Sequence, residues 1–336
     1  LAVVPGSAGA RPSEPPGRTP PGADGPQGVG LTTFEAEDPE RPGRTLTFDV
    51  WYPTELDTAS GAPATLPLMV TELALPGVRR DADPVHRPSP LVVFSHGSGG
   101  VRYQSWFLLQ ALAANGYVVI APDHAGNTAL DPIFGTTDPF PLVAANRPRD
   151  VSFAIDPALA RSASPGDLLA GTVDPTRIAV GGHSFGGFTA LAVAGGYQGW
   201  EPDERVDAII PIAAASSLLT DEELAAIDVP TLLLAGTHDE TVPLAAAAER
   251  PWDLISSRPA WRVDVHDAGH NSFTNVCDLL AALEGAGLPP ALLGFLVGSA
   301  EEGCAPDLIP IDEAQELTVQ YTLAFLRTTI GHDARW

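Results

Sequence analysis

The sequence predicts an α/β fold in which helices cover both faces of a mostly parallel, doubly wound sheet. The first observation is a series of short, continuous apolar runs, which are typical of strands buried on both faces. The second is that helical segments lie between several of these runs, as parallel strands require. The third is a pair of alternating segments near the start, typical of half-buried antiparallel strands. The six continuous runs are Leu91–Phe94, Tyr117–Ala121, Arg177–Gly181, Ala208–Ile212, Thr231–Ala235 and Trp261–Val265.

The sheet is expected to begin with an antiparallel edge. Apolar and polar residues alternate over Leu31–Glu37 and again over Thr45–Tyr52. Pro42-Gly43 lies between the two segments and marks a turn. These segments therefore predict two leading strands that run in opposite directions.

Four helices are predicted between and after the strands. Gln104–Asn115 has helical apolar spacing, and Gly116 is placed to cap its C-terminus. Thr220 and Glu223 have the spacing of a capping box at a helix start. The two other predicted helices are the Ala-rich segment Ser184–Ala194 and the terminal segment Ala314–Arg327.

Three segments depart from this pattern. Residues 1–30 contain seven Pro and seven Gly, which predicts a flexible N-terminal tail before a single domain at residues 31–330. Residues 278–310 form an insertion rich in Leu, Gly and Pro, which is either a lid or a set of helices packed on the body. Residues 127–149, with four Pro and two Phe, are expected to be irregular.

Composition excludes several classes of function. The chain of 336 residues has 42 acidic and 18 basic residues, a net charge of −24, which disfavours nucleic acid and anionic membranes as partners. All the basic residues are Arg, so every Lys-based mechanism is excluded. No run of 18 apolar residues occurs, so the sequence predicts no membrane span. Two cysteines are too few for a zinc ribbon or an iron–sulfur cluster.

The two cysteines flank residues 278–303, the larger part of the insertion. Cys277 and Cys304 are therefore expected to form a disulfide, and the alternative is a pair of free buried thiols in a cytosolic enzyme. The chain starts at Leu1 and not at Met, which we interpret as a processed N-terminus. Together these observations predict a secreted protein, extracellular or periplasmic.

A candidate nucleophile follows one of the buried runs. Gly182-His183-Ser184-Phe185-Gly186 fits the pattern G-x-S-x-G between a predicted strand and a predicted helix. This turn holds Ser184 in a strained conformation with its hydroxyl exposed, and a β-carbon at either glycine would collide with neighbouring backbone. Ser184 is therefore the predicted nucleophile.

The base and the acid should follow Ser184 in the order acid, then His. His270 comes directly after the last predicted strand, where Gly269 allows a tight turn toward Ser184. Asp239 comes just past the preceding strand, and its neighbour Glu240 is the fallback. His238 lies too early in the chain order to be the base. The sequence thus predicts a triad of Ser184, Asp239 and His270.

The oxyanion of such a reaction needs two backbone N–H donors. The amide of Phe185, directly after the nucleophile, is one candidate. The other is the amide of Ser98 in the glycine-rich loop after the first buried run, with Gly97 as the second choice. His96 is expected to brace this loop by hydrogen bonds.

From about Leu31 to Leu326 the chain resembles the α/β-hydrolase superfamily. Within it, the chain is similar to plasma-type platelet-activating-factor acetylhydrolases and their bacterial dienelactone-hydrolase-like relatives. The segments that carry this resemblance are Phe48–Pro53, Phe94–Gly100, Tyr117–His124, Gly182–Gly187 and the loops of Asp239 and His270. True dienelactone hydrolases use a Cys nucleophile, and Ser184 at that position indicates general ester hydrolysis.

The resemblance implies a serine carboxylic-ester hydrolase with an α/β-hydrolase fold that acts on short-chain or accessible esters through an acyl-enzyme. It implies Ser184, Asp239 and His270 as the triad, Ser98 and Phe185 as oxyanion donors, and neither a cofactor nor a metal. The expected partner is a small-molecule or polymeric ester, bound by a monomer. Alternatives are a secreted, cutinase-like polyester hydrolase, a lipase, or a catalytically inactive binding protein of the same fold.

Overall fold

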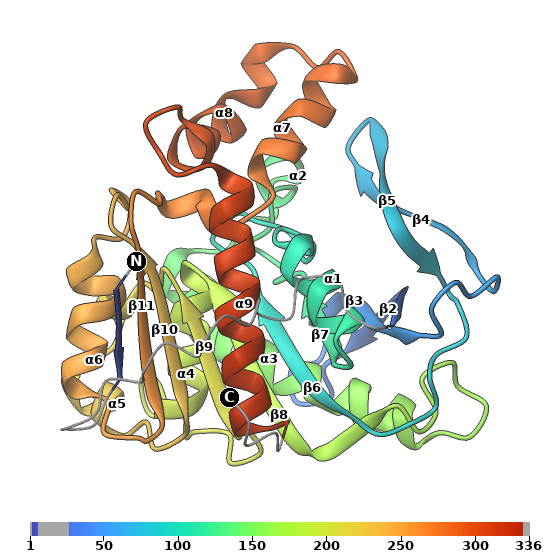
Figure 1. The fold of residues 1–336 in the computed structure, drawn as a ribbon, viewed down its shortest axis with the longest axis horizontal. Helices are drawn as coiled ribbons and strands as arrows, with labels where there is room; N and C mark the ends of the chain where they lie inside the picture. The colour runs from blue at the N-terminus through green and yellow to red at the C-terminus, as the bar shows by residue number, and fades with distance from the viewer. Residues whose placement is uncertain (1, 6–26, 332–336) are drawn as a thin grey trace, which may run out of the picture.

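The computed structural model describes residues 2–5 and 27–331 (Figure 1). Its strands are β1 (Ala2–Pro5), β2 (Gly28–Glu37), β3 (Thr45–Thr54), β4 (Ala62–Leu68), β5 (Thr71–Arg80), β6 (Ser89–Ser95), β7 (Val118–Pro122), β8 (Val173–His183), β9 (Ala208–Ile212), β10 (Thr231–Gly236) and β11 (Ala260–Val265). Its α-helices are α1 (Trp106–Ala114), α2 (Asp131–Phe134), α3 (Phe140–Ala163), α4 (Phe185–Gly195), α5 (Asp221–Ala225), α6 (Arg250–Leu254), α7 (Val276–Gly285), α8 (Pro290–Cys304) and α9 (Ile311–Thr329). Three short helical turns are η1 (Ser216–Leu218), η2 (Ala245–Glu249) and η3 (His270–Phe273).

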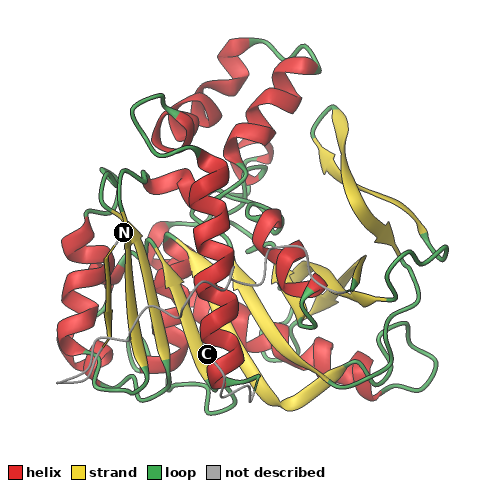
Figure 2. Cartoon of the chain, viewed as in Figure 1, coloured by secondary structure: helices red, strands yellow, loops and turns green. Residues whose placement is uncertain are grey.

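The described strands form one sheet with the order β1-β11-β10-β9-β8-β6-β7-β3-β2-β5-β4. The strands from β6 to β11 pair in parallel, and β2 and β3 pair antiparallel at the leading side. Helices lie on both sides of this sheet (Figure 2). The predicted fold class, an α/β-hydrolase fold with antiparallel leading strands, is confirmed.

The core consists of two apolar layers, one on each face of the sheet. Leu91 and Val93 of β6 point into the layer that contains α3 and α4, whereas Val92 and Phe94 point into the layer that contains α1 and α9. Consecutive residues of one strand are thus buried on opposite faces, which explains why the strand sequences are continuously apolar. Figure 1 shows α9 crossing the sheet on one of these faces.

Several elements were not predicted, among them β4, β5 and α3. The antiparallel hairpin of β4 and β5 joins the sheet through the parallel pairing of β5 with β2, and in Figure 1 it projects from the side of the molecule. The expectation of irregular structure over 127–149 is wrong in both halves, because α2 covers Asp131–Phe134 and α3 begins at Phe140 and contains Pro148 and Pro157. The apolar face of α3, which includes Val151 and Ile155, is buried against the sheet and offsets the cost of the prolines.

Most of the predicted tail lies outside the described residues. Of the remainder, Ala2–Pro5 pair antiparallel with β11, and Gly28–Gly30 already belong to β2. The sheet therefore begins before residue 31. Among the described residues no helix has the length and apolarity needed to cross a membrane.

The insertion at 278–310 consists mainly of α7 and α8. A disulfide joins Cys277 near the start of α7 to Cys304 at the end of α8, as predicted. The C-terminal end of α8 packs on the turn η3. Glu302 of α8 also accepts a hydrogen bond of 2.8 Å from the hydroxyl of Thr241, which lies in the loop after β10. The base of the insertion is therefore attached to the body at the loop that carries His270.

Removing the disulfide should destabilise the fold. The two cysteines are 27 positions apart, and closing a loop of that length is worth about 3–4 kcal/mol in the chain-entropy model. We expect the double variant Cys277→Ser/Cys304→Ser to lose a free energy of unfolding of this size in urea titrations. A double variant as stable as the wild type under oxidising conditions would contradict the prediction.

Candidate active site

Ser184 lies at the sharp turn between β8 and α4. Its backbone has φ 58° and ψ −116°, a strained conformation for a residue with a β-carbon. A β-carbon on Gly182 or on Gly186 would approach the carbonyl oxygen of Ser95 to less than 3 Å. The glycines therefore allow the turn to pass close to β6, and the turn presents Ser184 at the C-terminal edge of the sheet.

The predicted triad residues come together from three loops. The Nε2 atom of His270 lies 2.9 Å from the Oγ atom of Ser184. The Nδ1 atom of the same ring lies 2.8 Å from the Oδ2 atom of Asp239. These two contacts assign the ring a proton on Nδ1 and leave Nε2 to accept the hydroxyl proton of Ser184.

Asp239 is held in place by the turn that follows β10. It is buried, and its Oδ1 atom accepts a hydrogen bond of 2.6 Å from the amide of Val242. The fallback acid, Glu240, is exposed. His238 is also exposed and faces Asp267 at 3.4 Å. The geometry therefore brings Asp239, and neither of its neighbours, to His270.

The loop after β6 lies beside the nucleophile. The amide of Gly97 donates to Oε1 of Gln104 at 3.1 Å, so this N–H is already occupied. The amide of Phe185 is the first of α4 and has no acceptor within the helix. Of the two candidates in the loop, this arrangement favours Ser98 over Gly97 as the partner of Phe185.

A second histidine, His183, links the parts of the site and was not predicted to do so. Its Nδ1 atom accepts from Nε2 of Gln104 at 2.9 Å, and its Nε2–H donates to the backbone carbonyl of His270 at 2.8 Å. Burial and the neighbouring His270 lower the pKa of His183 to about 3. The neutral ring thus connects the nucleophile turn, the loop after β6 and the turn η3.

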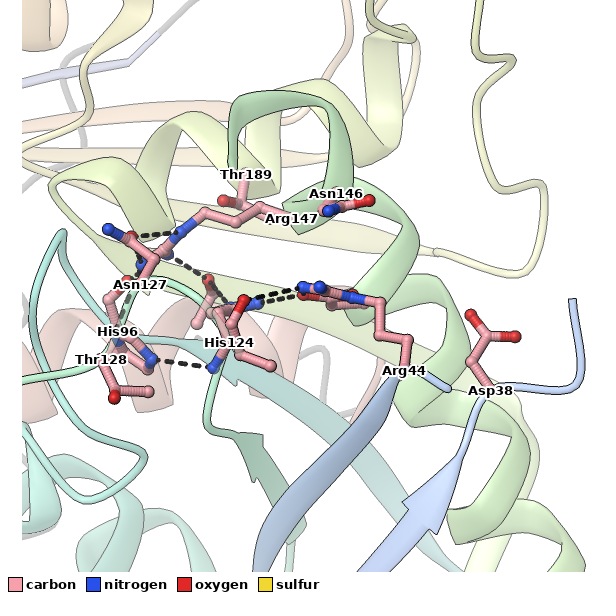
Figure 3. A network of polar contacts seen from close by, with 12 residues as sticks. Asp38, Arg44, His96, His124, Asn127, Thr128, Asn146, Arg147 and Thr189 are labelled. Atoms are coloured by element: carbon pink, nitrogen blue, oxygen red, sulfur yellow. Dashed lines mark hydrogen bonds and ion pairs between the residues drawn. The ribbon is translucent and has the colours of Figure 1, made fainter. Parts of the chain in front are cut away.

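A polar network lies behind the loop after β6 (Figure 3). His96 braces this loop as predicted, because its Nδ1–H donates to the carbonyl of Gly97 at 2.7 Å while its Nε2 accepts from the amide of His124. The ring of His124 bridges the hydroxyl of Ser95 and the carboxylate of Asp150, at 2.8 and 2.9 Å. Burial opposes ionisation of Asp150, but hydrogen bonds from Arg44 and His124 outweigh it and hold its pKa well below the ordinary value.

These buried histidines should make the fold sensitive to acid. Burial and then Arg147 lower the pKa of His124 to about 4 and also depress the pKa of His96, and the pKa of His183 is about 3. The unfolded chain takes up protons on these rings near the ordinary value of 6.5, whereas the folded chain does not. The stability that these neutral rings contribute is therefore fully present above pH 6.5. It is lost as the pH falls toward 4, at about 1.4 kcal/mol of unfolding free energy per pH unit for each ring.

Urea unfolding at a series of pH values checks this expectation. Replacing a buried ring, as in His124→Asn, should reduce the pH slope by about one proton per molecule. The matched control is His238→Asn, which makes the same substitution at an exposed ring. An unfolding free energy that does not change between pH 7 and pH 5 would count against the prediction.

Aromatic and apolar side chains form one rim of the site. The ring of Phe140, at the start of α3, stacks on the ring of Phe185 with 5.4 Å between centroids, and Phe185 stacks in turn on Phe188. The exposed large apolar side chains of this stretch are Leu130, Ile133, Phe134, Phe140 and Leu142. Sequence reasoning did not assign this rim, although the two Phe between residues 127 and 149 belong to it.

The chain matches known ester hydrolases. A family model described as PET hydrolase-like matches residues 103–284, just over half of the chain. A model for platelet-activating factor acetylhydrolase, isoform II, matches residues 21–142. The solved structure of a ferulic acid esterase from Streptomyces cinnamoneus is similar, with a TM-score of 0.68 and 27% identity over 91% of each chain. No curated protein matches the chain.

The matched families and the similar structure are all carboxylic ester hydrolases, so the enzyme interpretation is confirmed over that of an inactive binding protein. The fold and the strand–turn–helix that carries Ser184 agree with this assignment. The chain therefore belongs to the PET hydrolase-like family, within the α/β-hydrolase superfamily, and is a serine esterase.

Proposed function

We propose that the protein hydrolyses carboxylic esters through a triad of Ser184, His270 and Asp239 and a covalent acyl-enzyme. The observation that carries this proposal is the contact of 2.9 Å between Ser184 Oγ and the free nitrogen of a ring oriented by Asp239. The left-handed backbone of Ser184, which is rare for a residue other than Gly, supports its role as the nucleophile.

The reaction takes two matched steps. Ser184 Oγ attacks the ester carbonyl while His270 Nε2 takes the hydroxyl proton, and the carbonyl oxygen becomes an oxyanion that accepts from the amides of Ser98 and Phe185. The intermediate collapses, and His270 returns the proton to the departing alcohol. Water then attacks the acyl-enzyme with His270 again as the base, which releases the acid and restores Ser184. Asp239 keeps its charge and stabilises the protonated ring.

We propose short-chain or otherwise accessible esters as the substrates. The match to platelet-activating factor acetylhydrolase, isoform II, supports this class. A polyester is the second candidate, supported by the PET hydrolase-like match and by the exposed rim, where Phe134 is 70% and Phe140 is 55% exposed. Apolar side chains exposed next to the site favour contact with an extended apolar substrate.

One set of assays separates these candidates. The purified enzyme is tested on p-nitrophenyl esters from acetate to palmitate, on phospholipid vesicles, on a feruloyl ester and on an aromatic polyester film. Rates that fall steeply beyond butyrate support accessible esters, and soluble products from the film support the polyester. Rates that rise with chain length would instead indicate a lipase. Ser184→Ala is the blank for each substrate, and hydrolysis that survives in it would refute the proposed mechanism.

We also propose that the enzyme works in an oxidising compartment, extracellular or periplasmic, as a monomer with one catalytic domain that ends near residue 330 and whose sheet includes Gly28–Gly30 ahead of the predicted start at residue 31. The disulfide between Cys277 and Cys304 supports the compartment. Alkylation of the unreduced, denatured protein followed by mass spectrometry tests this assignment. Two alkylated cysteines in protein isolated from that compartment would contradict it.

A further inference from the structure

One buried cation takes no part in the proton transfers described above. Arg147 lies on α3 with 0% of its surface exposed. Burying a charge is costly unless it is paired, yet Arg147 forms no ion pair with a described residue. The acid one turn further along α3, Asp150, pairs instead with Arg41, Arg44 and His124. Burial lowers the pKa of Arg147 to about 9, so the guanidinium is charged at neutral pH.

The donors of Arg147 are directed at the backbone of the loop after β6 (Figure 3). Its Nη1 atom donates to the carbonyl of His96 at 2.6 Å, and its Nη2 atom donates to the carbonyl of Gly97 at 2.9 Å. Its Nε and Nη2 atoms also donate to Oδ1 of Asn127, at 3.1 and 2.7 Å. A planar fork on two successive carbonyls fixes both of their peptide planes.

The planarity of the peptide bond means that these contacts also fix the direction of the N–H of Ser98. The carbonyl of Gly97 and the N–H of Ser98 belong to one trans peptide and point in opposite directions. In the preceding peptide, Arg147 holds the carbonyl of His96 while Gln104 holds the N–H of Gly97 at 3.1 Å. Of these two peptides, the first thus has both its carbonyl and its N–H occupied, whereas in the second the N–H of Ser98 points away from the guanidinium and is left to donate.

The same guanidinium contacts the residue that supplies the other proposed donor. Its central carbon lies 4.7 Å from the centroid of the Phe185 ring, a cation–π contact. Asn127, held by Arg147, also donates from Nδ2 to the Ser98 hydroxyl at 3.3 Å. One side chain on α3 thus braces both residues whose amides would meet the oxyanion.

We propose that Arg147 is a positioning residue for the oxyanion hole, which it aligns through the carbonyls of His96 and Gly97 and through the ring of Phe185. This inference rests on the proposed function, because it takes Ser98 and Phe185 as the oxyanion donors. A cation on the carbonyl side of a peptide also polarises it, which makes its N–H a stronger donor to negative charge. The effect belongs to the tetrahedral intermediate and not to the bound ester.

The test compares Arg147→Met and Arg147→Lys with the wild type. Reactive sites are counted with a fluorophosphonate, and kcat and KM for p-nitrophenyl butyrate are expressed per reactive site. The inhibition constant of a phenylboronic acid, which forms a tetrahedral adduct with serine, is measured in parallel. For Arg147→Met we expect kcat to fall by roughly 10²-fold, with boronate affinity falling in step and KM changing by less than about threefold. Lys keeps the charge but loses the fork, so we expect a loss of about tenfold.

Arg44→Met is the matched control. Arg44 is another largely buried arginine of the same network, but it binds Asp150 and the carbonyl of Ala125 and not the loop after β6. We expect this variant to lower the melting temperature while kcat per reactive site stays within about threefold of the wild type. A merely structural role for Arg147 would produce the same pattern in both variants.

Several outcomes would overturn the proposal. They are an Arg147→Met enzyme with wild-type kcat per reactive site, a loss of kcat without a loss of boronate affinity, and an Arg44→Met enzyme that loses as much kcat as Arg147→Met. If Arg147→Met does not fold, Arg147→Lys decides by the same criteria, and unchanged kcat and boronate affinity in it refute the proposal. Failure of the proposed function gives a different result, namely a wild-type enzyme that the fluorophosphonate does not label at Ser184.

Discussion

Ser184→Ala should lower kcat by a factor on the order of 10⁶ while the fold is retained. The hydroxyl is the only group in the proposed mechanism that forms a bond to the substrate, so nothing replaces it when it is lost. The oxyanion donors and the binding surface are left intact, and a small residual rate over water is expected from them. Stopped or overnight assays with p-nitrophenyl butyrate measure the loss, and a far-ultraviolet dichroism spectrum checks the fold.

Ser89→Ala is a suitable control for this variant. Ser89 is a buried serine at the start of β6, at the opposite end of that strand from Ser95 and the active-site loop. It should keep near wild-type activity and fluorophosphonate labelling, whereas Ser184→Ala should lose both. A purified Ser184→Ala enzyme with activity within about tenfold of the wild type would exclude Ser184 as the nucleophile.

Local signals in the sequence were sufficient to predict the fold class and to select the three residues proposed as the triad. Each of these residues lies in the turn or loop that follows a buried strand, and a short apolar run with its loop is recognisable without knowledge of the rest of the chain. Glycines contribute to the same local signal, since Gly182 and Gly186 have no room for a β-carbon. The contacts of Ser184, His270 and Asp239 then agree with the order of the strands in the sheet.

The supporting contacts could not be predicted in this way because they join distant segments. Arg147 reaches the loop after β6 across 50 and 51 positions, and Gln104 reaches His183 across 79. Nothing in the neighbourhood of either residue indicates its partner. Arg147 was also concealed by Pro148, which made the middle of α3 resemble a loop. Identifying these residues required the packing of α3 against the sheet.

Asp239→Asn is the second variant with a large expected effect, a fall in kcat of roughly 10⁴. The carboxylate accepts the Nδ1–H of His270 at 2.8 Å and so keeps Nε2 free to take the proton of Ser184. An amide in its place can donate to Nδ1, which moves the ring proton to Nε2 and leaves no base facing the hydroxyl. The loss should appear in kcat more than in KM, because binding of the ester does not depend on this proton.

Glu240→Gln separates the role of Asp239 from the charge of its loop. Both substitutions remove one negative charge at adjacent positions, but Glu240 is exposed whereas Asp239 is buried against His270. We therefore expect Glu240→Gln to keep kcat within a few-fold of the wild type at all pH values. If the two variants exchanged their effects, Glu240 would be the acid, and the loop after β10 would have to rearrange in solution to bring Glu240 to the ring. Equal and small losses in both would instead mean that His270 is oriented without a carboxylate, with the hydrogen bond from His183 to its backbone carbonyl as the main remaining constraint.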